Sequence, residues 1–141
     1  MDVIVRSARA VLIDENQSVL LIKRMDNSAW GLPAGATELG ESISQCMERE
    51  VREETGLTVV SATPAAFYTE PRFSYENAHG RKHCTFAVSF RVSKWEGLLL
   101  RNTGEAIDAS FFGRNDMPNL VYSYEEVISD AFGYDGGFIA K

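Results

Sequence analysis

The chain has 141 residues, 45% of them hydrophobic, and a formal net charge of −6. This length and composition suit one globular domain over residues 1–141 with a core of its own, and they argue against a disordered chain. The acidic balance disfavours a stable nucleic-acid partner, because nucleic-acid-binding surfaces are basic. It also means that a polyanionic substrate needs cations as intermediaries at its site.

The sequence predicts neither a membrane span nor an export signal. No apolar run approaches the roughly 20 residues of a membrane helix, and the first fifteen residues lack the basic region, apolar segment and cleavage site of a signal peptide. The two cysteines, Cys46 and Cys84, lack metal-ligand spacing, so buried, reduced thiols are expected for both. We therefore expect a cytoplasmic protein with no membrane partner.

The first predicted elements are strands at residues 3–13 and 18–23, rich in β-branched and other apolar residues. The turn-forming cluster at residues 14–17 joins them into a predicted hairpin. Arg24 follows the second strand directly. It is either a solvated strand end or a contact to substrate phosphate.

A helix is predicted at residues 43–55. Ser42 and Gln45 have the spacing of a capping box, and Gly56 suits the left-handed position that closes a helix. Glu41, just before the helix, favours its N-terminus electrostatically and can pair with a basic neighbour.

Two glutamates fall on the apolar face of this helix. At about 100° per residue, Glu50 and Glu54 lie in the apolar stripe, and Glu53 and Arg49 flank it. The stripe itself consists of Ile43, Cys46, Met47 and Val51. A solvated charged face is the ordinary interpretation of such a run. However, inward carboxylates are costly without a cation, and one arginine cannot neutralise three glutamates. Clustered carboxylates suit Mg²⁺ or Mn²⁺, so the pattern favours a metal site.

Residues 35–57 resemble the signature of the Nudix hydrolases. That signature is a glycine, five residues, a glutamate, seven residues, then Arg-Glu-aliphatic-any-Glu-Glu-any-Gly-aliphatic. Every specified position is filled, by Gly35, Glu41, Arg49, Glu50, Val51, Glu53, Glu54, Gly56 and Leu57. The resemblance implies an α/β fold, an α/β/α sandwich with a mixed sheet.

The resemblance also implies roles for the matching residues. Mg²⁺, or Mn²⁺ as the alternative, is expected on Glu50 and Glu54, with help from Glu53 and the carbonyl of Gly35. Glu53 is the first candidate for the general base, oriented by Arg49, although family members differ in which glutamate is the base. Basic residues at the place of Arg24 contact substrate phosphates in several members.

A long strand is predicted at residues 57–69, followed by a polar and aromatic loop at residues 70–82. Such a loop on a rigid scaffold is a common place for substrate selection. Its candidate substrate-binding residues are Arg72, Phe73, Tyr75 and His79. The alternative is a solvated hairpin loop.

The last predicted elements are strands at residues 83–92 and 109–112, a turn at residues 95–97, and a helix from Ser123 to about Phe132. Ser123 and Glu126 repeat the capping-box spacing.

Nudix proteins often place one more acidic residue in the loop before the last strand, where it completes the metal site or acts as base. Glu105 is the best match in this chain, and Asp108 is the alternative.

The implied activity is Mg²⁺-dependent hydrolysis of a nucleoside diphosphate linked to another moiety, X. Nucleotide sugars such as ADP-ribose and nucleoside triphosphates are both possible substrates, and a homodimer is possible by analogy with relatives. One alternative is a non-catalytic Nudix-like domain that binds nucleotides as a sensor. Another is a structural domain whose glutamates form only salt bridges.

Overall fold

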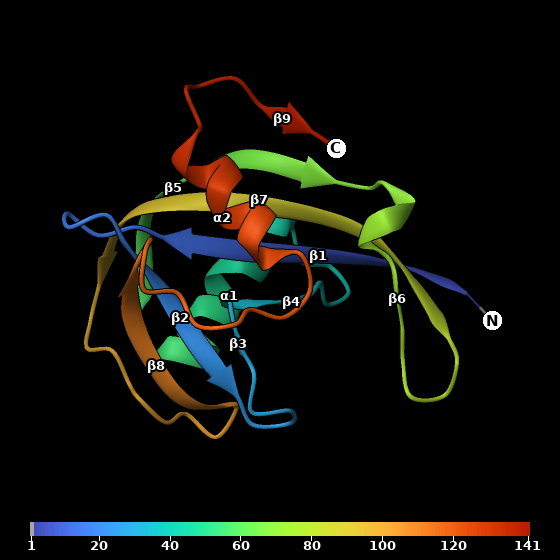
Figure 1. The fold of residues 1–141 in the computed structure, drawn as a ribbon, viewed down its shortest axis with the longest axis horizontal. Helices are drawn as coiled ribbons and strands as arrows, with labels where there is room; N and C mark the ends of the chain where they lie inside the picture. Colours follow the sequence, from blue (N-terminus) through green and yellow to red (C-terminus); the bar gives the residue numbers. More distant parts are fainter. Residues whose placement is uncertain (1) are drawn as a thin grey trace.

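Two β-sheets and two α-helices form the fold, as described over residues 2–141 by a computed structural model (Figure 1). Met1 of the predicted domain lies outside the described residues. The elements are β1 (Val3–Leu12), β2 (Ser18–Arg24), β3 (Trp30–Gly31), β4 (Ala34–Ala36), α1 (Ile43–Thr55), β5 (Thr58–Tyr68), η1 (Pro71–Phe73), β6 (Tyr75–Glu76), β7 (Lys82–Glu96), β8 (Ala106–Gly113), α2 (Tyr124–Phe132) and β9 (Ile139–Ala140).

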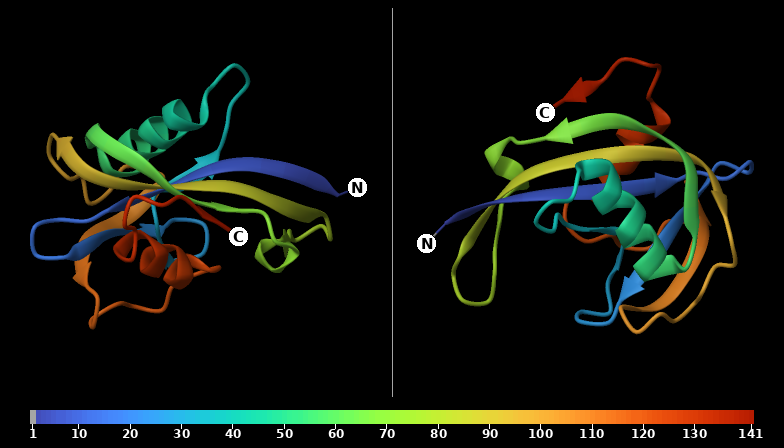
Figure 2. Two further views of the ribbon diagram at one scale, coloured as in Figure 1. Left: turned by 90° about the horizontal axis from the view of Figure 1, so that it is seen from above. Right: turned by 180° about the vertical axis from the view of Figure 1, so that it is seen from behind.

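The larger sheet is mixed and lies between the two helices. Its strand order is β4-β1-β7-β5-β9, with β6 paired to β7. β1 runs parallel to β7, whereas β5 runs antiparallel to it. Alternate residues of β1 face opposite helices: Ala10 packs in the core under α1, and Val11 packs in the core under α2. Figure 2 shows the helices on opposite sides of this sheet. The predicted α/β/α sandwich with a mixed sheet is confirmed.

The predicted hairpin of the first two strands is wrong. β2 belongs to a second sheet of order β3-β2-β8, and β1 and β2 share only the bridge between Ile13 and Val19. The turn between them forms as expected, since the Asp14 carboxylate accepts the backbone N–H groups of Asn16 and Ser18. Beyond the turn, every residue from 19 to 22 is fully buried, and alternate residues enter the two cores. β2 is therefore buried on both faces, between the two cores, and it lies outside the larger sheet.

Helix α1 has the predicted bounds and both predicted caps. The Ser42 hydroxyl accepts the Gln45 N–H at 3.1 Å, and the Gln45 side chain accepts the Ser42 N–H at 2.9 Å. Gly56 ends the helix with φ 79°, in the left-handed region. These caps fix where Glu50, Glu53 and Glu54 lie along the chain.

The second predicted capping box is wrong. Ser123 has φ −100° and ψ 26°, and its side chain makes no cap hydrogen bond to α2. An N-cap hydroxyl reaches the helix from an extended backbone, which Ser123 does not have. The Glu126 carboxylate instead accepts hydrogen bonds from Arg72 and Lys141.

β7 is longer than predicted, because it continues to Glu96. Trp95 pairs with Val59 across the sheet, and its ring stacks on that of Phe111 with the centroids 5.8 Å apart. The predicted turn at residues 95–97 is therefore strand up to Glu96, and the chain turns at Gly97, where φ is 98°.

Two remaining expectations concern the cysteines and the membrane. Cys46 is buried as expected, whereas Cys84 is only half-buried, and both are free thiols. Within residues 2–141, no helix is long and apolar enough to span a membrane.

Candidate active site

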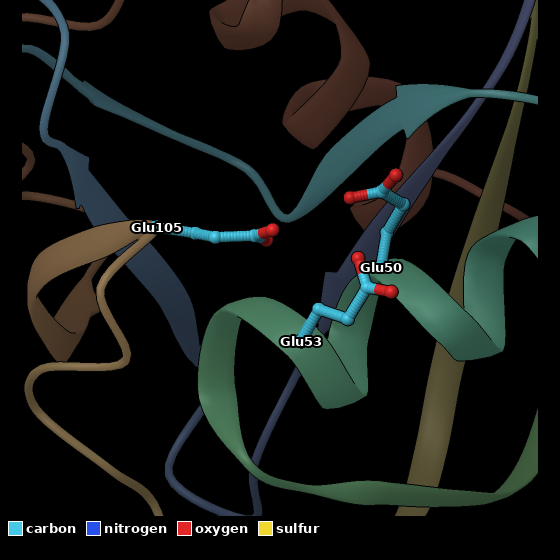
Figure 3. A group of neighbouring side chains, drawn as sticks. All are labelled: Glu50, Glu53 and Glu105. Atoms are coloured by element: carbon cyan, nitrogen blue, oxygen red, sulfur yellow. The ribbon is translucent and has the colours of Figure 1, made fainter.

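Three carboxylates from two elements meet at the edge of the fold (Figure 3). Glu50 and Glu53 project from α1, and Glu105 reaches toward them from the loop before β8. One oxygen from each lies within 4.8 Å of the others. The alternative candidate, Asp108, instead forms an ion pair with Arg101 at 3.0 Å. The structure thus brings Glu105, rather than Asp108, to the helix glutamates.

Glu54 lies deeper than the other carboxylates, at 4% exposure. Its Oε1 accepts the backbone N–H of Ala34 at 2.9 Å. Burial raises the pKa of Glu54 to about 9, and the charge of nearby Glu50 adds to the effect. Burial also raises the pKa of Glu50. Both groups hold protons more tightly than usual because the effect of desolvation outweighs that of the nearby arginines.

Gly35 lets the backbone of β4 approach the Glu50 carboxylate. A Cβ at this position would collide with all three atoms of that carboxylate group. The Gly35 carbonyl accepts the thiol of Cys46 at 3.4 Å, which ties β4 to α1. A side chain here would displace the Glu50 carboxylate, so glycine serves close approach at this position and not a left-handed backbone.

Arg49 joins the glutamates into a network. Its guanidinium donates to Glu41 at 2.7 and 3.0 Å, to Glu50 at 2.7 Å and to Glu53 at 3.2 Å. It also donates to the carbonyl of Ala36 at 3.1 Å. The hydrogen bond from Arg49 lowers the pKa of Glu41 to about 2. Glu41 thus has the basic partner expected for it, and Arg49 fixes the carboxylate of Glu50 as well as that of Glu53.

A cavity of about 180 Å³, here called the aromatic pocket, opens beside the carboxylates. Its lining consists of Val5, Ser7, Arg9, Arg24, Ala34, Gly35, Ala36, Phe73, Tyr75, Thr85, Tyr122 and Tyr124. A neighbouring pocket contains Glu50, Glu54 and Glu105. The two pockets share Arg24 and Gly35 in their walls, so a ligand can extend from one into the other.

The predicted substrate-binding residues are placed in different surroundings. Tyr75 and Phe73 line the aromatic pocket, and Arg24 lies where the two pockets meet. Arg72 does not line either pocket: it pairs with Glu70 at 2.8 Å and with Glu126 at 2.7 Å. His79 is exposed and lies outside both linings.

The charged and aromatic pocket residues that the sequence reasoning missed are Arg9, Tyr122 and Tyr124. Arg9 had a usable signal, because a charged residue within an apolar strand is rarely buried without a purpose. Tyr122 and Tyr124 come from the other end of the chain, and only the fold brings them to β1.

The chain resembles known proteins in sequence and structure. Residues 3–131 match the family model described as the NUDIX domain. The chain is 30% identical over 129 residues to an ADP-ribose pyrophosphatase of Methanocaldococcus jannaschii, covering 89% of this chain and 72% of that protein. It is 35% identical over 71 residues to a putative 8-oxo-dGTP diphosphatase of Bacillus subtilis, covering 50% of this chain and 48% of that protein.

Structural similarity points to the same fold. The crystal structure of a MutT Nudix hydrolase from Burkholderia pseudomallei superposes with a TM-score of 0.75 at 20% identity, covering 92% of this chain and 98% of that one. The family match covers nearly all of the chain, and the carboxylates of the matched motif meet in one site. The chain therefore belongs to the Nudix family and is a hydrolase of phosphoric anhydride bonds.

Proposed function

We propose that this enzyme hydrolyses a nucleoside diphosphate linked to another moiety X, with Mg²⁺ as its cofactor and Mn²⁺ as a substitute. The substrate is a nucleotide sugar such as ADP-ribose or a nucleoside triphosphate. The observation that carries the proposal is the convergence of Glu50, Glu53 and Glu105 beside a pocket large enough for part of a nucleotide. The M. jannaschii relative, named an ADP-ribose pyrophosphatase, supports the first substrate class.

The carboxylates fit a divalent cation on chemical grounds. All the side chains concerned offer oxygen, which is the ligand type that Mg²⁺ prefers. The raised pKa values of the desolvated Glu50 and Glu54 carboxyls indicate that Arg49 alone does not balance the negative charge of this cluster. The residues that would hold the cation are Glu50, Glu53, Glu54, Glu105 and the carbonyl of Gly35. A bound divalent cation neutralises charge on the phosphate oxygens and acidifies water.

The protein residues position the water and receive its proton. Glu53 is our candidate for the general base, because its side chain is 41% exposed and therefore reaches the rim where substrate and water enter. The 3.2 Å contact with Arg49 keeps this carboxylate oriented. Arg24, at the junction of the two pockets, is our candidate for a phosphate contact.

The reaction is a displacement at phosphorus. The water oxygen forms a bond to one phosphorus, its proton passes to Glu53, and the bond from that phosphorus to the bridging oxygen breaks. The bridging oxygen leaves with the second phosphoryl group. Because little covalent chemistry falls to the protein, positioning and charge neutralisation account for most of the catalysis.

Two substitutions test this proposal directly. Glu53→Gln and Glu54→Gln each remove one charge with almost no change in shape, and we expect kcat to fall by orders of magnitude while the fold persists. The assay supplies a panel of nucleotide sugars and nucleoside triphosphates with Mg²⁺ and identifies the phosphate-containing products. Glu48→Gln, on the exposed side of the same helix, is the matched control. Near-normal turnover of both variants would contradict the proposed roles.

A further inference from the structure

Arg9 lies in the aromatic pocket as a buried cation, and no acidic side chain among the described residues forms an ion pair with it. Its side chain is on β1, it is 8% exposed, and its Nη1 atom is buried without any hydrogen-bond acceptor. The ion pairs within residues 2–141 use other cations, namely Arg24, Arg49, Arg72, Arg101 and Lys141. The contacts that Arg9 does make are to aromatic rings.

Those rings stabilise Arg9 only in part. The guanidinium carbon lies 5.6 Å from the ring centroid of Tyr68 and 5.4 Å from that of Tyr124. Cation–π contacts are weaker than the hydration that a buried guanidinium gives up, so a charge-bearing partner is missing. The hydroxyl of Tyr68, which donates to Asp130 at 2.8 Å, is neutral and does not supply that charge.

The rest of the pocket is built for a ligand that brings negative charge. Its lining contains two arginines, Arg9 and Arg24, and no acidic residue, although the whole chain carries a charge of −6. Tyr122 forms one wall with its backbone in the left-handed region at φ 56°, which is unfavourable for a non-glycine residue. Its ring is exposed and lies 5.6 Å from the ring of Tyr75. Such strain is typical of ligand-binding positions.

We propose that Arg9 binds an anionic group, a phosphate monoester or a carboxylate, carried by moiety X of the substrate. The inference rests on the proposed function, because the diphosphate at the carboxylate cluster leaves X to enter the adjoining pocket past Arg24. An anion on X compensates the buried charge with charge-assisted hydrogen bonds, and the flanking tyrosines contact the apolar part of X. Arg9 is thus a specificity-determining residue, which selects anionic over neutral forms of X.

The test compares substrates that differ by a single anionic group. ADP-ribose 1″-phosphate and ADP-ribose, and NADPH and NADH with their adenosine half as X, differ by a phosphate monoester on X. UDP-glucuronate and UDP-glucose differ by a carboxylate. We expect the wild-type kcat/KM to favour the anionic member of at least one pair by about tenfold or more, which is the usual worth of a hydrogen bond to a charged group. The phosphate pairs and the carboxylate pair identify which anion is bound.

Arg9→Gln should reduce that ratio to about one, because it removes the charge and keeps a hydrogen-bond donor. The ratio is measured within one protein, so any loss of folded enzyme cancels. Arg6→Gln is the matched control, since Arg6 is an exposed arginine on the same strand and lines neither pocket. Ratios near one in the wild type, or an unchanged ratio in Arg9→Gln, would overturn the inference. Absence of pyrophosphate cleavage in all six compounds and in the wider nucleotide panel would instead overturn the proposed function.

Discussion

Glu54 and Arg49 show how single residues adapt a helix to catalysis. Glu54 occupies a position that an apolar residue would fill in an ordinary amphipathic helix, with 4% of its surface exposed. Arg49 lies nearer the surface of the site and donates hydrogen bonds to Glu41, Glu50 and the carbonyl of Ala36. Glu54 therefore offers a buried carboxyl group to a cation, and Arg49 holds the neighbouring carboxylates in place.

Glu54→Gln should stabilise the metal-free protein at alkaline pH. The pKa of Glu54 is about 9 in the folded protein, against 4.5 for the free group. A carboxyl that holds its proton more tightly when folded makes the free energy of unfolding fall as the pH rises from 4.5 toward 9. Gln has no proton to lose and keeps an oxygen to accept the Ala34 N–H. The gain over wild type should approach the order of 2 kcal/mol at pH 8.

Thermal unfolding of both proteins in EDTA, at pH 5 and pH 8, measures this difference. The advantage of the variant should be larger at pH 8, because there wild-type Glu54 loses its proton on unfolding, whereas at pH 5 the unfolded group still keeps part of its proton. A variant that is less stable than wild type at pH 8 would contradict the assigned desolvation of Glu54.

Arg49→Lys should reduce kcat by about 10- to 100-fold, the usual effect of losing a residue that orients catalytic ligands. Lysine keeps the charge, but its single ammonium group cannot bind Glu41 through two nitrogens and also reach Glu50 and Ala36. Steady-state kinetics with saturating Mg²⁺ give the comparison. Arg52→Lys, at an exposed position one turn on, is the control and should behave as wild type. Equal losses in the two variants would argue against a special role for Arg49.

At the scale of elements, helix α1 holds Glu50, Glu53 and Glu54 in register with β4. Its N-terminal cap is local in sequence, formed by Ser42 and Gln45. Its buried face packs against β1 and β5 through residues such as Met47 and Val51. Because the cap and the buried stripe agree, the helix has one position along the chain and one rotation about its axis.

Ser42→Ala should lower the free energy of unfolding by about 1 kcal/mol, the typical value of an N-cap side chain. The substitution leaves the Gln45 N–H without its side-chain acceptor and loses one half of the capping box. Denaturant unfolding monitored by circular dichroism measures the change. Ser44→Ala, an exposed position in the same first turn, should be neutral or slightly stabilising because alanine is the better helix former. If Ser44→Ala were as destabilising as Ser42→Ala, the capping role would be refuted.

The elements also show what sequence reasoning can reach. Helix α1 could be predicted to the residue because its caps, apolar stripe and closing glycine all lie within fifteen residues of one another. The sheet that β2 joins could not be predicted, because a turn indicates that the chain reverses its direction but not which sheet the next strand joins. The capping pattern at Ser123 failed for a related reason: distant Arg72 and Lys141 take the Glu126 carboxylate.

The site divides in the same way. The glutamates of the Nudix signature could be predicted from their spacing, and Glu105 could be predicted from its place before the last long strand. The aromatic pocket could not, since Arg9, Tyr75 and Tyr122 come from β1, β6 and the loop before α2. Their meeting depends on the parallel pairing of β1 with β7, which joins residues 80 positions apart, as in Val3 with His83.

At the scale of the whole molecule, one ion-pair network ties α2 to two distant parts of the chain. Glu126 on α2 accepts Arg72 through both carboxylate oxygens, at 2.7 and 2.9 Å, and the Lys141 ammonium at 2.6 Å. Lys141 also reaches Asp130 at 3.2 Å. The network fixes η1 and the C-terminal residue against the helix that follows Tyr122. Through it, the tyrosine wall of the pocket depends on contacts outside the pocket.

Glu126→Gln should lower the melting temperature at neutral pH and lose this effect in acid. Arg72 and Lys141 lower the pKa of Glu126 to about 2, against 4.5 for the free group. A carboxylate with a depressed pKa contributes stability above pH 4.5, and the contribution is lost as the pH falls from 4.5 toward 2. Since the network is partly exposed to solvent, we expect a deficit of about 1 kcal/mol or less at pH 7.

Melting curves of wild type and variant at pH 7 and pH 3, in low salt, test the Glu126 network. The deficit should be smaller at pH 3, and raising the salt concentration should shrink it at pH 7, because salt screens exposed ion pairs. Glu125→Gln is the matched control, since Glu125 is exposed on the same turn of α2 and forms no ion pair within residues 2–141. A deficit that is the same at both pH values would mean that Glu126 stabilises the fold through packing and not through its charge.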